Sequence, residues 1–263
     1  MTDPRLPEER RPGPSRRVRV IGIGSGHPDQ LTREAADALA GVAYVIAAAK
    51  GEDDPLLDVR RRLCASAGVR LVAVADPERE RGRDETSATT AYRGAVRDWH
   101  EARVAAYEEV LRAEPGDVAF LVWGDPAFYD STLRVVDRLR ERGAVDFVHD
   151  VVPGVSSPQL LAARHRIVLH RVGEPVLVTT GRRLADDVAA GHENLVVMLD
   201  GDLACLGLDP AGWRIWWGAN LGTGEEQLVA GALGEVGEEI RRRRAAVSQA
   251  AGWVMDTYLL RRA

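Results

Sequence analysis

Three short loops rich in glycine, serine and aspartate have the residue types needed to bind a polar small molecule. They occupy residues 22–28, 124–131 and 153–158, and each follows an apolar run typical of a buried strand. Glycine lets a ligand approach the backbone closely, and hydroxyl or carboxylate side chains can bond its polar groups. Ligands of open parallel sheets bind beyond the carboxyl ends of the strands, so the loops together predict one shared binding site.

The first loop, GIGSGHP at residues 22–28, matches a dinucleotide-binding fingerprint only in part. That fingerprint requires a third glycine where His27 stands, and an acidic residue about 20 positions later to bind the ribose. The second apolar run ends instead in Ala-Ala-Ala-Lys at residues 47–50. A nicotinamide-dependent oxidoreductase is therefore disfavoured, and taken alone this loop is better explained as a plain turn between a strand and a helix.

The second and third loops each allow a structural and a functional interpretation. Asp125 stands at a strand end and could cap the next helix, although other polar residues of its loop could do the same. Ser156 or Ser157 could be the N-cap of the helix that follows the third loop, or could bond a ligand at the strand edge. Each loop is weak evidence alone, but three such loops at successive strand ends favour a site.

The elements that must position these loops follow from the apolar periodicity. Apolar runs predict strands at 17–21, 42–46, 69–74, 117–123 and 147–152, and helical spacing predicts helices at 31–40, 56–67, 92–111 and 131–142. This alternation is typical of an α/β domain around a mostly parallel sheet. Closer strands follow at 175–179, 194–199, 213–217, 226–229 and 253–259, which favours a mixed sheet. We expect a disordered tail over 1–16, an exposed loop over 77–90, and two α/β domains over 17–171 and 172–263.

Composition excludes several classes of protein. The net charge of the 263 residues is −5, with only three Phe and five Tyr, which argues against a nucleic-acid partner. No run of about 18 apolar residues is present, so no membrane span is expected. The first residues contain acids and no apolar run, which disfavours a leader and favours a cytoplasmic protein. Cys64 and Cys205 stand far apart in the sequence, so neither a disulfide framework nor a metal site is expected.

The glycine turn, GDPAFYDS at 124–131 and PGVSS at 153–157, in this order, resemble the tetrapyrrole methylase family. The likeness covers nearly the whole chain from Arg17 onward. It implies two α/β domains with S-adenosylmethionine held in the cleft between them, a small-molecule tetrapyrrole substrate and a homodimer. Ser25 and His27 depart from the Pro and Asp that most relatives carry, which weakens the transfer of the first-loop contacts.

Longer strings resemble one branch of this family. They are LVWGDPAFYDSTLR at 121–134, HRIVLHRVGEPVLVTTGRRL at 165–184, VVMLDG at 196–201 and WVMDTYLLRR at 253–262. The likeness implies methylation of C-1 of precorrin-5 with release of acetate, giving precorrin-6A. No arginine precedes the second loop, which argues against uroporphyrinogen as substrate. Methylation of a precorrin at another ring carbon is the alternative within the family, and a non-catalytic binding module is disfavoured by the three loops.

The resemblance also implies which residues contact the methyl donor. They are Gly24, Ser25, Trp123, Gly124, Asp125, Phe128, Ser156, Ser157 and Gly222, with Leu199 or Asp200. A substrate with many carboxylates needs cations, and residues 164–183 contain five arginines against one acid. We assign Arg164, Arg166 and Arg171 to the substrate, with a solvated face of surface ion pairs as the alternative. Asp98, His100, Tyr129 and His170 are candidates to activate water by chemical type alone.

Overall fold

The computed structural model describes residues 16–51, 54–77 and 90–263, with the side chains of 90–98 left out. Residues 1–15 of the expected tail, residues 78–89 of the expected loop and the side chain of Asp98 lie outside the described residues. By their contacts the described residues form two compact units. The second unit contains residues 22–35, 122–128 and 153–263, and the first contains the remainder. The units follow contacts rather than chain order, so the single boundary predicted after residue 171 stays a prediction.

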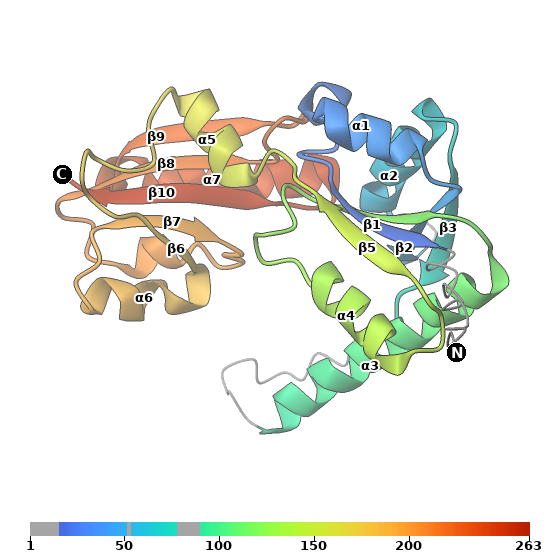
Figure 1. The fold of residues 1–263 in the computed structure, drawn as a ribbon. Helices are drawn as coiled ribbons and strands as arrows, with labels where there is room; N and C mark the ends of the chain where they lie inside the picture. Colours follow the sequence, from blue (N-terminus) through green and yellow to red (C-terminus); the bar gives the residue numbers. More distant parts are fainter. Residues whose placement is uncertain (1–15, 52–53, 78–89) are drawn as a thin grey trace, which may run out of the picture. The chain divides into compact units, whose positions relative to one another are not determined.

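A five-stranded sheet forms the centre of the first unit, and its order is β3-β2-β4-β1-β5 (Figure 1). Its strands are β1 (Arg17–Gly22), β2 (Tyr44–Ala49), β3 (Arg70–Ala75), β4 (Val118–Val122) and β5 (Val148–Val152). β1 pairs with β5, and β2 with β3 and β4, all in parallel. All five residues of β4 are buried, as expected for a central strand covered on both faces. The predicted parallel sheet is therefore confirmed.

Four α-helices lie at the positions that the periodicity predicts. They are α1 (Arg33–Ala40), α2 (Pro55–Ser66), α3 (Thr90–Ala113) and α4 (Thr132–Arg142), and a short 3-10 helix that was not predicted, η1 (Pro28–Gln30), precedes α1. Local chemistry sets their ends: Asp54 caps α2 by accepting the N–H groups of Leu56 and Leu57. Gly143 ends α4 with a φ of 63°, the left-handed conformation that glycine adopts easily after the last turn of a helix.

The second unit contains a mixed sheet with the order β6-β7-β10-β8-β9. Its strands are β6 (Leu177–Thr180), β7 (Asn194–Met198), β8 (Trp213–Ala219), β9 (Gln227–Ala232) and β10 (Asp256–Arg262). Its helices are α5 (Ser157–His165), α6 (Gly181–Ala189), η2 (Ala204–Gly207) and α7 (Leu233–Ala251). β6 and β7 are parallel, whereas β10 is antiparallel to both of its neighbours. The mixed sheet and the α/β class are thus confirmed.

Side chains alternate between the two faces of this sheet, and each face packs against different helices. Trp217 belongs to an apolar cluster with Leu184 of α6 and Ile240 of α7. Its neighbour Trp216 packs on the opposite face, against a cluster that includes Leu161 of α5. Burial of both faces removes large apolar areas from water, at about 25 cal/mol per Å². The sheet is therefore a rigid platform for the loops at its edges.

One edge of the second sheet, called the loop edge below, is formed by the ends of β7 and β8 and the start of β10. The antiparallel register confirms this arrangement, because Thr257 pairs with Met198 and Asp256 pairs with Ala219. Residues that follow β7 or β8, or precede β10, are therefore neighbours although they are far apart in the sequence. Within the described part of the chain, no helix is long and apolar enough to span a bilayer.

Candidate functional site

The first two glycine loops are joined backbone to backbone. Gly24 and Gly124 exchange two hydrogen bonds, in which the N–H of Gly24 donates over 3.2 Å and that of Gly124 over 2.7 Å. Just before them, the N–H of Ile23 donates to the carbonyl of Val122 at 2.8 Å. By their contacts, the first loop, the third loop and residues 124–128 of the second loop all belong to the second unit. The structure therefore brings the first two loops together.

The third loop packs on the first two through Gly154. A Cβ atom on Gly154 would lie 2.7 Å from the carbonyl carbon of Gly22 and would also overlap the carbonyl oxygen of Gly124. Only glycine therefore allows the three backbones to approach this closely. Asp125 adds a polar link, because its Oδ2 accepts the N–H of Gly154 at 2.9 Å while its Oδ1 accepts that of Ala127 at 2.8 Å. Asp125 thus joins the second loop to the third.

Replacing Asp125 with alanine is expected to lower the free energy of unfolding by about 2 kcal/mol, because two N–H groups lose a charged acceptor. Urea unfolding at neutral pH measures this loss. Asp209→Ala is a matched control, since Asp209 accepts a single N–H group, that of Ala211, in an exposed turn. Equal losses in the two variants would contradict the linking role of Asp125.

The structure assigns different positions to the two serines of the third loop. Ser156 is 2% exposed and caps α5, because its hydroxyl accepts the N–H of Gln159 at 3.4 Å while its own N–H donates to the side chain of Gln159 at 2.9 Å. This reciprocal pattern is a capping box, so the structural interpretation applies to Ser156. Ser157 begins the helix and is only partly buried. Of the two hydroxyls, that of Ser157 is the one left available to a ligand.

Leu199 and Asp200 follow β7 at the loop edge. Like the two serines, they differ in that one side chain is bonded to the protein and the other is exposed. Asp200 is 4% exposed, and its Oδ2 accepts the hydroxyl of Tyr258 at 2.6 Å and the N–H of Ala204 at 2.8 Å. Burial raises the pKa of Tyr258, so its hydroxyl stays protonated and donates. Leu199 is 64% exposed and has a φ of 52°, a left-handed conformation that leucine rarely adopts. Asp200 therefore holds the loop, and Leu199 presents its side chain to solvent.

Gly222 follows β8 and contacts the first glycine loop. Its carbonyl accepts the hydroxyl of Ser25 at 3.4 Å, and a Cβ on Gly222 would lie 2.6 Å from that hydroxyl oxygen. Asn220, two residues earlier, has a φ of 46° and bonds the backbone on either side of residue 254. Non-glycine residues with a left-handed backbone conformation are uncommon, and they concentrate at functional sites. The structure thus brings Ser25 and Gly222 together.

The sequence reasoning missed Trp253 and Met255, which precede β10 at the loop edge. The rings of Trp123 and Trp253 lie 6.4 Å apart, so the second loop meets this edge through an aromatic pair. Met255 is 39% exposed, and among the described residues only a few large apolar side chains are exposed to this extent. The only signal available was the position of these residues directly before a strand, which becomes informative once β10 is known to be antiparallel to β7 and β8.

The collected groups suit a ligand with a flat apolar part and several polar groups. Exposed apolar side chains at the loop edge, Leu199 and Met255, can cover a planar ring. The hydroxyls of Ser25 and Ser157 and the backbone of the glycine loops supply hydrogen-bond partners. A nucleoside with an amino-acid tail has this chemistry, so the residues present fit S-adenosylmethionine.

Two residues predicted to bind substrate or activate water lie at the opposite edge of the second sheet. Arg171 donates to the carbonyl of Arg262, the last residue of β10, at 2.6 Å. The ring of His170 bonds the carbonyl of Arg171. Because β10 starts at the loop edge and ends away from it, the structure does not bring this pair to the loops.

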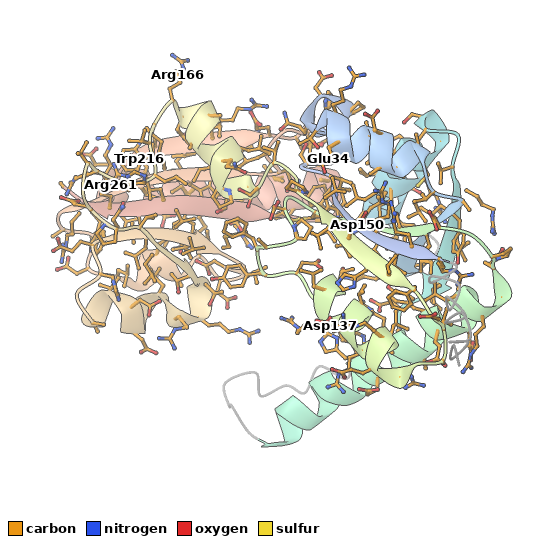
Figure 2. The ribbon with its side chains drawn as sticks, viewed as in Figure 1. Glu34, Asp137, Asp150, Arg166, Trp216 and Arg261 are labelled. Atoms are coloured by element: carbon orange, nitrogen blue, oxygen red, sulfur yellow. The ribbon has the colours of Figure 1, made fainter. Side chains whose placement is uncertain are left out.

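The other two arginines also stand outside the loops. Arg166 ends α5 with a φ of 56° and points away from the helix (Figure 2). Arg164 is engaged in an ion pair, in which its Nε donates to both carboxylate oxygens of Glu226 at 3.0 and 2.9 Å. The assignment of these arginines to the substrate stays a prediction.

The remaining candidates, His100 and Tyr129, belong to the first unit. His100 lies in α3 with its ring 4.8 Å from that of Trp99. Tyr129, within the second loop, is 45% exposed and has a φ of 51°, a left-handed conformation that is uncommon outside glycine. Their roles in activating water stay predictions.

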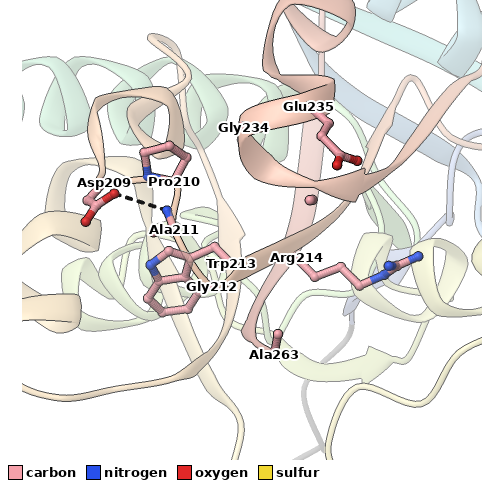
Figure 3. Close-up of a pocket in the computed structure, with 10 residues that line it drawn as sticks. Asp209, Pro210, Ala211, Gly212, Trp213, Arg214, Gly234, Glu235 and Ala263 are labelled. Carbon is pink, nitrogen blue, oxygen red and sulfur yellow. Dashed lines mark hydrogen bonds between the residues drawn. The ribbon is translucent and has the colours of Figure 1, made fainter.

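A pocket of about 400 Å³ opens at the start of β8, beside Trp213, Arg214 and the first turn of α7 (Figure 3). It lies at the opposite end of β8 from Gly222, so it is separate from the glycine loops. This pocket and the polar groups of the glycine loops therefore lie in different places. The candidate site is the loop edge, where the contacts described above converge.

Comparison with known proteins gives one family. The model of the tetrapyrrole (corrin/porphyrin) methylases matches residues 17–237. A curated protein from Sinorhizobium sp. named precorrin-6A synthase (deacetylating) is 42% identical over 255 residues, which cover 94% of this chain and 95% of that protein.

Solved structures agree with this assignment. A cobalamin synthesis related protein (CobF) from Corynebacterium diphtheriae has a TM-score of 0.79 at 35% identity, over 94% of this chain and 98% of that one. A uroporphyrin-III C-methyltransferase from Thermus thermophilus, solved with S-adenosylhomocysteine, has a TM-score of 0.56 at 23% identity, over 93% and 96% of the two chains. The second likeness concerns the fold alone.

Proposed function

The chain belongs to the tetrapyrrole methylase family, and we propose that it transfers a methyl group from S-adenosylmethionine to C-1 of precorrin-5, with release of acetate. The observation that carries this proposal is the 42% identity, over 94% of the chain, to a protein named precorrin-6A synthase (deacetylating). The three joined glycine loops at the loop edge support it independently, because they offer a site for the donor.

We assign the donor to the loop residues and the loop edge. The proposed contacts are Gly24, Ser25, Trp123, Gly124, Asp125, Phe128, Ser156, Ser157, Leu199, Asp200 and Gly222. Within this set, Asp125, Ser156 and Asp200 act by holding loops, since their side chains are engaged with the protein. When bound, S-adenosylmethionine supplies an electrophilic methyl group. The loops contribute by orientation, which is worth up to about 7–11 kcal/mol of a reaction barrier.

Acetate release adds a second step that the chain must support. Attack of water on the acetyl carbonyl breaks the bond between that carbon and C-1 of the ring, and the electron pair stays on C-1. The electron-rich carbon then takes the methyl group. Deacylation first is our hypothesis for the order. The water-activating group is proposed among His100, Tyr129 and His170. Arg166 and Arg171 are proposed for the substrate carboxylates, whereas the guanidinium of Arg164 is already paired with Glu226.

The deciding measurement is incubation with precorrin-5 and S-adenosylmethionine, followed by mass spectrometry of the tetrapyrrole and an acetate assay. We expect a product that gains one methyl group, loses the acetyl group and is matched by an equal amount of acetate. A methyl gain without acetate would move the enzyme to another ring carbon. A donor-free incubation is the control for the order, because absence of acetate there would contradict deacylation first.

The same resemblance leads us to propose a homodimer located in the cytoplasm. Light scattering after size exclusion tests the first part, since a homodimer has twice the mass of the 28.6 kDa chain.

A further inference from the structure

An ion pair connects α5 to the loop between β8 and β9. Arg164, in the last turn of α5, donates from Nε to both carboxylate oxygens of Glu226, at 3.0 and 2.9 Å. The side chain of Glu226 is 21% exposed and that of Arg164 is 37% exposed, so water screens the pair only in part. The two residues are 62 positions apart in the chain. The pair therefore connects a helix to a loop that nothing in the local sequence would place beside it.

Glu226 has a second partner within the loop. Its Oε2 accepts the N–H of Gly222 at 2.6 Å, and a hydrogen bond to a charged acceptor is stronger than one between neutral groups. Gly222 has a φ of +78°, and its own carbonyl accepts the hydroxyl of Ser25. Contacts thus run from α5 through one carboxylate to Gly222, and from there to the first glycine loop.

The other end of α5 belongs to the third glycine loop. Ser156 caps the helix, and the N–H of Gly154 just before it is held by Asp125. A nine-residue helix is about 13 Å long and stiff. Its first turn is therefore tied to the second and third loops, while its last turn is tied through Glu226 to the loop after β8.

We propose that Glu226 is a positioning residue for methyl-donor binding, and that Arg164 acts through it by holding the carboxylate on the N–H of Gly222. This inference rests on the proposed function, because it assumes that Gly222 and Ser25 contact the donor. Arg164 then serves the donor loop through Glu226, rather than a carboxylate of the substrate. Without Glu226, the turn from Asn220 to Gly222 loses a bond that holds Gly222 in contact with Ser25.

An ordinary surface ion pair would behave differently. Such a pair contributes little to stability, because water screens both charges, and it is not expected to change the affinity for a ligand. Arg241 and Glu238 on α7 form a pair of that kind, 3.5 Å apart and with side chains 60% and 87% exposed. Glu238→Gln is therefore a matched control for Glu226→Gln, because both replace a paired carboxylate by its amide in the same unit.

The experiment measures the dissociation constant of S-adenosylhomocysteine by calorimetry for the full chain and its variants. We expect Glu226→Ala to raise this constant about tenfold, which equals about 1.4 kcal/mol. Glu226→Gln keeps an acceptor for Gly222, so a rise of about threefold is expected, with a similar rise for Arg164→Gln. Arg164→Lys should restore most of the affinity, and Glu238→Gln should leave it unchanged.

Turnover separates positioning from a general structural role. The KM for S-adenosylmethionine should rise in step with the dissociation constant, while kcat at saturating donor and the KM for the tetrapyrrole stay unchanged. If the wild type binds S-adenosylhomocysteine and the Glu226 and Arg164 variants bind it equally well, the inference is overturned and the proposed function stands. If the wild type does not bind it, the proposed function fails and the inference fails with it.

Discussion

Gly154→Ala is expected to abolish measurable binding of S-adenosylhomocysteine and to lower the free energy of unfolding by about 2–3 kcal/mol. The added Cβ would lie 2.7 Å from the carbonyl carbon of Gly22 and would overlap the carbonyl oxygen of Gly124. Both are backbone atoms, so no side chain can rotate to make room. Separation of the three loops is the only relief, and it removes the geometry on which the donor site depends.

Calorimetry with S-adenosylhomocysteine and urea unfolding measure the two effects of Gly154→Ala. The control is Gly207→Ala in η2, where an added Cβ meets no atom within 4 Å. It should change stability by no more than about 0.5 kcal/mol and leave binding intact. Donor binding by Gly154→Ala with wild-type affinity would show that the meeting of the three loops is not needed for the site.

Arg244→Met is expected to lower the free energy of unfolding by about 3 kcal/mol at neutral pH, because it leaves a buried carboxylate without its cation. Asp256, at the start of β10, has a side chain only 4% exposed, and its Oδ2 accepts Nε of Arg244 at 2.9 Å and Nε1 of Trp217 at 3.2 Å. Arg241→Met, on the same helix and in an exposed pair, is the control and should cost less than about 1 kcal/mol.

The loss caused by Arg244→Met should depend on pH. Burial already raises the pKa of Asp256, and the charge of Arg244 lowers it, so removal of Arg244 raises this pKa further. A carboxyl whose pKa is raised on folding binds more protons in the folded state, so its contribution to stability falls as pH rises through the folded pKa. The loss should therefore be larger at about pH 8 than at about pH 5. Urea unfolding at both values tests this, and an equal loss would contradict an uncompensated charge on Asp256.

The order of the strands and of α1 to α4 follows from the apolar periodicity, and the start of β10 is an informative exception. The pattern at 253–259 predicts a strand from Trp253, whereas β10 begins at Asp256. The reason is a side chain: Asn220 donates from Nδ2 to the carbonyl of Trp253 and accepts the N–H of Met255 at Oδ1. Apolar residues reveal that a segment is buried, but not which partner its backbone groups will take.

The sequence also indicated that residues of the three loops bind a ligand, without separating those that contact it from those that hold the loops. Ser156 and Ser157 are chemically alike, and only the contact of Ser156 with Gln159 identifies the cap. In the same way, the residues next to Asp125 in the sequence do not reveal which group its carboxylate binds. Its bond to the N–H of Gly154 crosses 29 positions and exists only once the strands are side by side.

By itself, the sequence determined the α/β class, the mixed second sheet, the glycine loops and the family, because these depend on local periodicity and on short runs of specific residues. The tertiary structure alone decided which polar groups are engaged. Asp200 bonds Tyr258 across 58 positions, and Arg164 bonds Glu226 across 62. Such pairings depend on how strands and helices pack, since burial requires each polar group to find a partner wherever the fold places one. Because of these pairings, a residue that the sequence suggests as a ligand contact acts instead by positioning its neighbours.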